Sequence, residues 1–121
     1  MKDPTTNQHP GRFADARRIL DIAEVTPGLP FPSICATIAS FNYTQVTHAQ
    51  DAAEAVAMAE TILSYALKLT FEPADIAPIG SSDHYVLEAY LPSGLKVAIV
   101  AKAQHMREAG QDRSERKLVA A

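Results

Sequence analysis

The sequence predicts an α+β domain, a two-layer sandwich in which one long central helix lies on an antiparallel sheet. Two patterns carry this prediction. Apolar residues recur every three or four positions from Asp51 to Leu67, which is the period of an amphipathic helix. Between Tyr85 and Ala101 they occupy every second position on either side of a Pro-Ser-Gly turn, which is the period of two half-buried strands. The predicted element order is α-β-β-α-β-β-β, followed by a possible C-terminal helix.

Length and composition fit one small globular domain. The hydrophobic fraction of the 121 residues is 47% and the charged fraction is 21%, far from the low hydrophobicity and high charge of disordered chains. We expect residues 13–103 to form this domain. Residues 1–12 are expected to be a flexible N-terminal arm, and residues 104–121 a charged tail that is partly helical or disordered.

Charge and cysteine content limit the binding partners and the cellular location that we expect for this protein. The net charge of −3 leaves no overall positive field for binding nucleic acid. Residues 1–11 lack the apolar core of a signal peptide, and no apolar run approaches the ~20 residues that span a bilayer. The single cysteine, Cys35, excludes an internal disulfide. We therefore expect a cytoplasmic protein that does not bind membranes.

The first helix is predicted over residues 13–25. Its buried stripe is expected to consist of apolar residues at three- and four-residue steps: Phe13, Ala16, Ile19, Leu20 and Ala23. Three prolines within residues 26–32 end this helix, because proline removes backbone donors and favours an extended chain before it. A stiff loop leading into the sheet is expected there.

A β-hairpin is predicted after this loop. Its strands cover residues 33–40 and 43–49, and its turn is placed at Phe41-Asn42. Cys35 lies in the first strand among small and aliphatic residues, so it is expected to be a small buried hydrophobe.

The central helix is expected to open at Asp51. Asp51 and Glu54 form a pair typical of a capping box, in which the aspartate oxygen accepts a hydrogen bond from an orphan backbone N–H. Alanine is concentrated in the first half of this helix, which allows close approach to a sheet. A short strand is predicted at residues 69–71, and the last hairpin turns at Pro92-Ser93-Gly94 in a type I turn closed by a left-handed residue.

No set of residues has the spacing that a known chemistry requires. Ser81-Ser82-Asp83-His84 contains the residue types of a hydrolytic triad, but a triad is assembled from distant positions, so these are predicted to be turn residues. His48 and His84 end predicted strands without HxH or HxxxH spacing, and there is no GxGxxG or P-loop. We predict no catalytic, cofactor-binding or metal-binding residues, and we expect a protein that is not an enzyme.

The more informative feature is an excess of apolar surface on the last hairpin. One face of this hairpin is apolar, and the other is partly apolar too, which is more than one helix can cover. Either this second face contacts a partner, or the first helix and the proline-rich loop cover it. The predicted protein interface consists of Val86, Tyr90, Ala98 and Val100.

Two resemblances bear on this sequence. The element order resembles that of the small acidic type III secretion chaperones and related chaperone-like domains, which place helices around a twisted antiparallel sheet and pair as homodimers. This likeness covers most of the chain at the level of topology and implies a homodimer. Leu29-Pro30-Phe31-Pro32 before a strand, an alanine-rich helix, and then Leu91-Pro92-Ser93-Gly94-Leu95 also resemble small proteins of actinobacteria and their phages and mobile elements. No activity is implied by either resemblance.

Three classes of function are open at this point. The first is a non-enzymatic protein-binding module, homodimeric, that acts as an adaptor, chaperone or inhibitor of a larger protein. The second is a nucleic-acid-associated accessory or regulatory factor of a phage or mobile element that uses the basic residues near Arg17 and Arg113. The third is a small enzyme that uses Cys35 or His84, which would need a base or carboxylate at hydrogen-bonding distance. The apolar excess and the absence of catalytic spacing favour the first.

Overall fold

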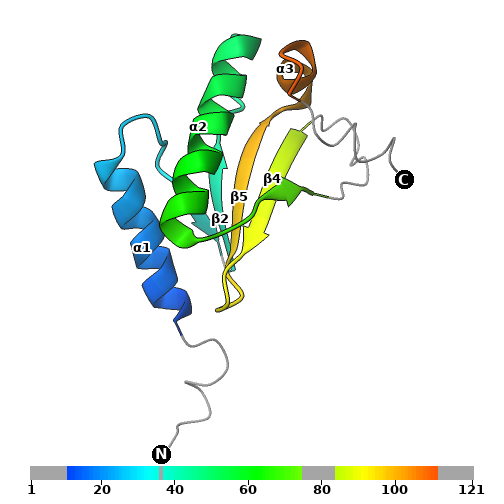
Figure 1. The fold of residues 1–121 in the computed structure, drawn as a ribbon. Coiled ribbons are helices and arrows are strands. Elements are labelled where there is room, and N and C mark those ends of the chain that lie inside the picture. Colours follow the sequence, from blue (N-terminus) through cyan, green and yellow to red (C-terminus); the bar gives the residue numbers. More distant parts are fainter. Residues whose placement is uncertain (1–10, 36, 75–83, 112–121) are drawn as a thin grey trace, which may run out of the picture.

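The structure is a computed structural model that describes residues 11–35, 37–74 and 84–111, and the structural statements below concern these residues. Along the chain the elements are α1 (Arg12–Val25), β1 (Ser33–Cys35), β2 (Ile38–Asn42), α2 (Ala49–Leu67), β3 (Glu72–Pro73), β4 (His84–Tyr90), β5 (Lys96–Lys102) and α3 (Ala103–Glu108). This is the predicted order of elements, and the α+β fold class is confirmed (Figure 1).

The five strands form one open sheet in the order β1-β2-β5-β4-β3. β4 and β5 pair antiparallel along their whole length, but β2 pairs with β5 in the parallel direction. The sheet is therefore mixed, and the prediction of a wholly antiparallel sheet is wrong in this respect. The reason is that α2 carries the chain back along the sheet, so that β3 runs in the same direction as β2. Because β4 is antiparallel to β3, and β5 is antiparallel to β4, β5 also runs in the direction of β2.

The turn between β4 and β5 has the predicted geometry. Gly94 has a φ of 93°, in the left-handed region that favours glycine. Its N–H donates to the Leu91 carbonyl at 2.8 Å, and the Leu91 N–H donates to the Leu95 carbonyl at 2.9 Å. The prediction of a turn closed by a left-handed residue is confirmed.

The first hairpin is shorter than predicted, and its turn lies earlier in the chain. β1 pairs with β2 from Ser33 opposite Ser40 to Cys35 opposite Ile38, so Phe41 and Asn42 belong to a strand and not to a turn. Phe41 is fully buried, so its place in the core outweighs the turn preference of its neighbour. Asn42 does begin a turn, because its Oδ1 accepts a hydrogen bond from the Thr44 N–H at 2.7 Å. The predicted strand over residues 43–49 is replaced by this connection to α2.

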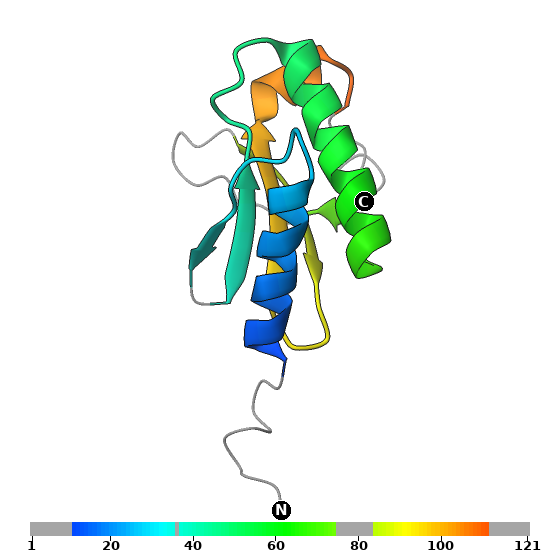
Figure 2. The same ribbon diagram turned by 90° about the vertical axis from the view of Figure 1, so that its left-hand side faces the viewer.

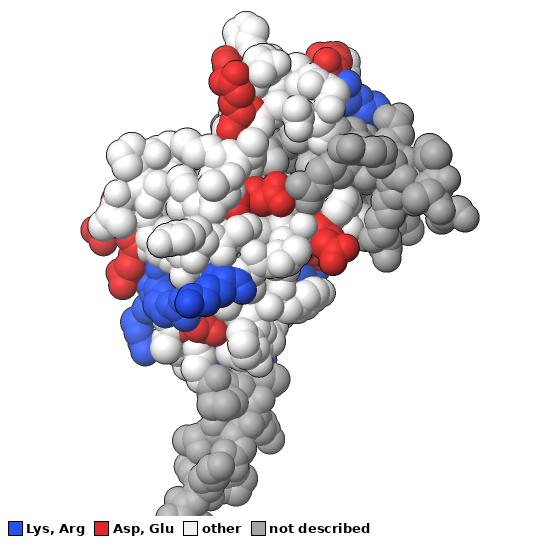
Figure 3. Space-filling view, in the orientation of Figure 1, with Lys and Arg blue, Asp and Glu red and all other residues white. Residues whose placement is uncertain are grey.

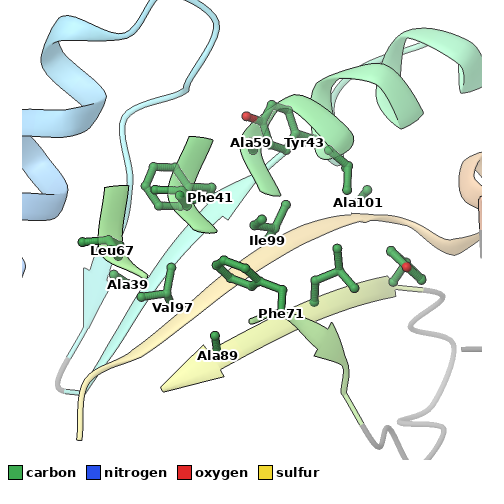
Figure 4. Packing of buried hydrophobic residues seen from close by; sticks show 14 of the residues in the cluster. Ala39, Phe41, Tyr43, Ala59, Leu67, Phe71, Ala89, Val97, Ile99 and Ala101 are labelled. Carbon is green, nitrogen blue, oxygen red and sulfur yellow. The ribbon is translucent and has the colours of Figure 1, made fainter. Parts of the chain in front are cut away.

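The central helix α2 packs on the sheet through a stripe of small and large apolar residues. The buried residues of α2 are Ala52, Ala53, Val56, Ala59, Leu63 and Leu67. Ala59 and Leu67 face the strands that carry Phe41, Val97 and Ile99 (Figure 4). The alanines leave room for the helix backbone to approach the sheet closely, as the sequence predicts.

The start of α2 differs from the prediction. The helix begins at Ala49, with His48 at the N-cap position and no capping hydrogen bond from its side chain. Asp51 lies within the first turn, with its carboxylate 3.8 Å from the His48 ring and largely exposed. The predicted capping role of Asp51 is therefore wrong. Its negative charge favours the helix through the dipole at the N-terminal end.

The first helix, α1, lies on the same face of the sheet as α2 (Figure 2). Ile19 is fully buried in the cluster that contains Phe41 and Leu63. At the start of α1, the Asp15 carboxylate accepts a hydrogen bond of 2.7 Å from the Ser93 hydroxyl in the β4–β5 turn. Phe13, predicted to be buried, is 80% exposed, because it lies six residues before Ile19 and so about 120° around the helix from it.

The last helix, α3, follows β5 directly and closes one end of the core. Met106 is 2% exposed and contributes to the same hydrophobic cluster as α1 and α2. Residues 104–111 are thus the part of the predicted C-terminal tail that the structure describes. Residues 112–121 and residues 1–10 of the predicted arm lie outside the described residues. Within the described ranges, no helix has the length and apolarity needed to cross a bilayer.

Leu63 and Ile62 provide a matched test of this packing. Leu63 of α2 is fully buried, whereas its neighbour Ile62 on the same helix is half-buried at the edge of the apolar stripe. We expect Leu63→Ala to lower the free energy of unfolding by ~2–5 kcal/mol, because truncation leaves a cavity in the core. Ile62→Ala should cost clearly less. Urea denaturation followed by circular dichroism measures both, and equal losses would show that α2 is rotated relative to the packing described.

Candidate protein-binding face

The helices cover one face of the sheet and leave the other without a described helix. In β4 and β5, Tyr85, Leu87, Val97 and Ile99 point toward the helices and belong to the buried cluster. The alternate residues point the other way. We call the outer face the set of nine residues Ile38, Ser40 and Asn42 of β2, Lys96, Ala98 and Val100 of β5, and Val86, Glu88 and Tyr90 of β4.

Strand pairing arranges the outer face in three rows. The rows are Ile38–Lys96–Tyr90, Ser40–Ala98–Glu88 and Asn42–Val100–Val86. Side chains directly opposite each other on neighbouring strands have Cβ atoms about 5 Å apart. The four residues of the predicted interface therefore lie on one face within three adjacent rows. The predicted alternative, that α1 covers this face, is wrong, because α1 packs on the helical side.

Exposure on the outer face is greatest along one row. Tyr90 is 61% exposed and Ile38 is 36% exposed, so two large apolar side chains meet solvent on either side of Lys96. Val86 and Val100 are half-buried opposite each other. Ala98 is 5% exposed, because its small side chain at the centre of the face is covered by its neighbours. Five of the nine residues are thus apolar, with Ala98 at the centre and two apolar residues in each of the two flanking rows.

The charges of the outer face are paired within the chain. The Lys96 ammonium lies 3.1 Å from Glu88 Oε2 and 5.8 Å from the centre of the Tyr90 ring. The hydrogen bond to Glu88 raises the pKa of Lys96 and outweighs the opposite effect of partial burial. The other seven residues of the face carry no charge. These nine residues therefore carry no net charge, and the exposed Glu72, opposite Glu88, and Lys102, two residues after Val100, lie at their borders on the same side of the sheet.

The two residues considered for an enzyme are not brought together. Cys35 is exposed, which corrects the prediction of a buried hydrophobe, because β1 is an edge strand and Cys35 lies opposite Ile38, beside the outer face. His84 is exposed at the start of β4, opposite Lys102. Two strands, β2 and β5, separate β1 from β4, so the backbones of Cys35 and His84 are at least about 14 Å apart.

The described geometry gives little support to a metal site, to the triad-like segment or to a basic nucleic-acid site. Within the described ranges, no three His, Cys, Asp or Glu residues lie close enough together to hold a metal ion. Ser81, Ser82 and Asp83 of the triad-like segment lie outside the described residues, as does Arg113. Lys and Arg side chains gather over the α1 side of the molecule with Asp and Glu beside them (Figure 3). On α1, Arg17 is exposed and the Arg18 guanidinium donates to the Asp15 carboxylate at 3.3 Å.

One feature beside α1 is not predicted by the sequence. A groove of about 440 Å³ is lined by Leu20, Asp21, Ala23, Glu24 and Phe31. Its signal in the sequence is Phe31 between two prolines, because Pro32 is fully buried and the extended chain then turns Phe31 outward.

Comparison of the chain with protein-family models, with curated proteins and with solved structures gives no match in any of the three. The proposals below therefore rest on the geometry of the outer face and of the groove.

The Lys96–Glu88 pair is testable without knowledge of a partner. We expect Glu88→Gln to lower the pKa of Lys96 toward its ordinary value of 10.5, because the substitution removes the carboxylate that holds the ammonium form. Titration of the Lys96 side chain by heteronuclear NMR measures this change, with Lys68 of the same spectrum as an internal reference. An unchanged Lys96 titration would show that the two side chains do not interact in solution.

Proposed function

We propose that this chain is a non-enzymatic protein-binding module that pairs with a second copy of itself through the outer face. The observation that supports this proposal is a sheet face with exposed Ile38 and Tyr90, half-buried valines and no net charge, over which no described helix lies. Soluble proteins rarely leave such a face to water, and a contiguous apolar patch commonly marks a contact with another protein.

A second copy suits the chemistry of this face. Glu88 and Lys96 neutralise each other within one chain, so the face offers little attraction to a strongly charged partner. In a twofold pair, a residue on the axis meets its own copy. An axis through Ala98 that follows neither its row nor its strand puts a small apolar side chain on the axis and leaves Glu88 and Lys96 off it. The flanking Val86 and Val100 then pack against the partner sheet.

The size of the face sets the expected affinity. Three strands about 4.8 Å apart and five residues at about 3.3 Å each give a flat patch of roughly 15 by 17 Å. Stable interfaces bury about 800 Å² on each partner, which is more than this patch supplies without its borders. We therefore expect a dimer with a dissociation constant in the micromolar range.

Such a dimer leaves the helical layers of both copies facing outward, which is suited to an adaptor, chaperone or inhibitor of a larger protein. A cytoplasmic location belongs to the proposal, because the single cysteine is exposed and a reducing compartment keeps such a thiol free.

Light scattering at several concentrations tests the homodimer. We expect the parent protein to run as a dimer at about 100 µM, and Val100→Glu to be a monomer that remains folded. The reason is that an unpaired carboxylate buried in an interface costs several kcal/mol, whereas on a solvated strand face it costs little.

The matched control is Thr61→Glu, which adds the same charge at an exposed position of α2 on the helical side and should remain a dimer. A monomeric parent across the concentration range would refute pairing through the outer face. A Val100→Glu variant that loses its circular dichroism signal would instead assign this face to the core of a single chain.

A further inference from the structure

The groove between α1 and the loop that follows it lies on the helical side, away from the outer face. It is lined by Leu20, Asp21, Ala23 and Glu24 of α1 and by Phe31 of the loop. At about 440 Å³ it lies within the usual size range of ligand sites. Phe31 is 86% exposed, so one wall of the groove is a large aromatic side chain in water.

The loop that carries Phe31 is fixed at both ends. Gly28 has a φ of 96°, and a Cβ there would come within 2.6 Å of the Met58 methyl group, so the loop backbone rests directly on α2. The Tyr43 hydroxyl, whose pKa burial raises to about 12, donates to the Gly28 carbonyl at 3.5 Å. On the other side Pro32 is fully buried. A wall held in this way loses little conformational freedom when a ligand binds.

The negative charge of the groove is not explained by the helix itself. Asp21 and Glu24 lie in the last two turns of α1, near the negative end of the helix dipole, where acidic side chains are unfavourable. No basic residue lies in the last turn of α1. Within the part of the chain that the structure describes, neither carboxylate has an ion pair within 4 Å. The two carboxylates and the negative end of the helix dipole therefore meet beside an apolar wall, one helical turn after the exposed Arg17.

We propose that this groove binds a segment of a partner protein in which a basic side chain is flanked by apolar side chains. The cation would lie between Asp21 and Glu24 and over the face of Phe31, where carboxylates and an aromatic ring both attract it. Its flanking apolar residues would pack on Leu20 and Ala23. Val25, 76% exposed next to the groove, extends the apolar surface beyond it.

A protein segment fits this groove better than a small molecule does. Ligand pockets bury most of a small molecule, whereas this groove is bounded by exposed side chains and continues into exposed surface at Val25. Its carboxylates disfavour nucleic acid. The inference does not depend on the homodimer, because no residue that lines the groove belongs to the outer face.

Titration of the isotopically labelled full chain with the peptide acetyl-Ala-Leu-Arg-Leu-Ala-amide tests this inference by NMR. We expect saturable shifts of the amides of Leu20, Asp21, Ala23, Glu24 and Phe31, with a dissociation constant of about 1 mM or lower. The double substitution Asp21→Asn with Glu24→Gln should weaken binding about fivefold, as expected for the loss of two exposed charge pairs. Phe31→Ala should weaken it as well.

The matched control is Asp51→Asn with Glu54→Gln, which removes the same two charges from an exposed face of α2 and should bind as the parent does. Equal binding of a peptide with Glu in place of Arg, or equal binding by the two double variants, would overturn the proposal. Saturable binding of free arginine amide as tight as that of the peptide would overturn it in favour of a small-molecule site. Light scattering on the same samples reports the dimer separately.

Discussion

Close packing of α2 on the sheet is the interaction on which the rest of this structure depends. Ala52 and Ala59 on the helix and Ala39 and Ala101 on the strands are all fully buried, so the two layers approach each other with little between their backbones. Leu63 of the same helix is also fully buried and belongs to the same hydrophobic cluster. Because α2 also returns the chain to the start of the sheet, it makes β2 and β5 parallel neighbours at the centre. Ile19 brings α1 to the same face, and the opposite face keeps no described helix.

This one-sided arrangement separates two surfaces of different character. The outer face is apolar with one internal ion pair, so its chemistry favours another surface like itself. The groove beside α1 is apolar and acidic, and its chemistry favours a basic segment of a different protein. A dimer formed through the outer face would carry two such grooves on its two outward helical layers. Two linked grooves bind a partner with two suitable segments more tightly than one groove does.

Much of this fold could be predicted from the sequence because its strongest patterns are local. The alternation around Pro92-Ser93-Gly94 fixes the β4–β5 hairpin, and the apolar stripe fixes the position of α2. The parallel pairing of β2 with β5 could not be predicted, because no local pattern reports which strands meet after a crossover. The turn predicted at Phe41-Asn42 begins only at Asn42, since burial of the aromatic ring keeps Phe41 in β2.

The residues of the candidate sites also fall into two groups, those that local patterns predict and those that depend on non-local contacts. Val86, Tyr90, Ala98 and Val100 could be found by period-two alternation, because residues on one strand face share a surface whatever the rest of the fold does. Ile38 joins them only through the non-local pairing of β2 with β5. Cys35 is exposed because β1 is an edge strand, which depends on the order of the whole sheet. The groove needs α1 and Phe31 to lie side by side, and no spacing along the chain encodes that contact.

Pairing through the outer face is tested most directly by the accessibility of this face to a soluble gadolinium chelate. The chelate broadens the NMR signals of valine methyl groups that it can approach. Val25, 76% exposed on the helical side, should be broadened at every protein concentration, and the fully buried Val97 should be protected at every one. We expect Val86 and Val100 to be protected at about 1 mM protein and to become increasingly broadened as dilution toward about 10 µM dissociates part of a micromolar dimer. Broadening of Val86 and Val100 that does not change with concentration would contradict pairing of two copies through the outer face.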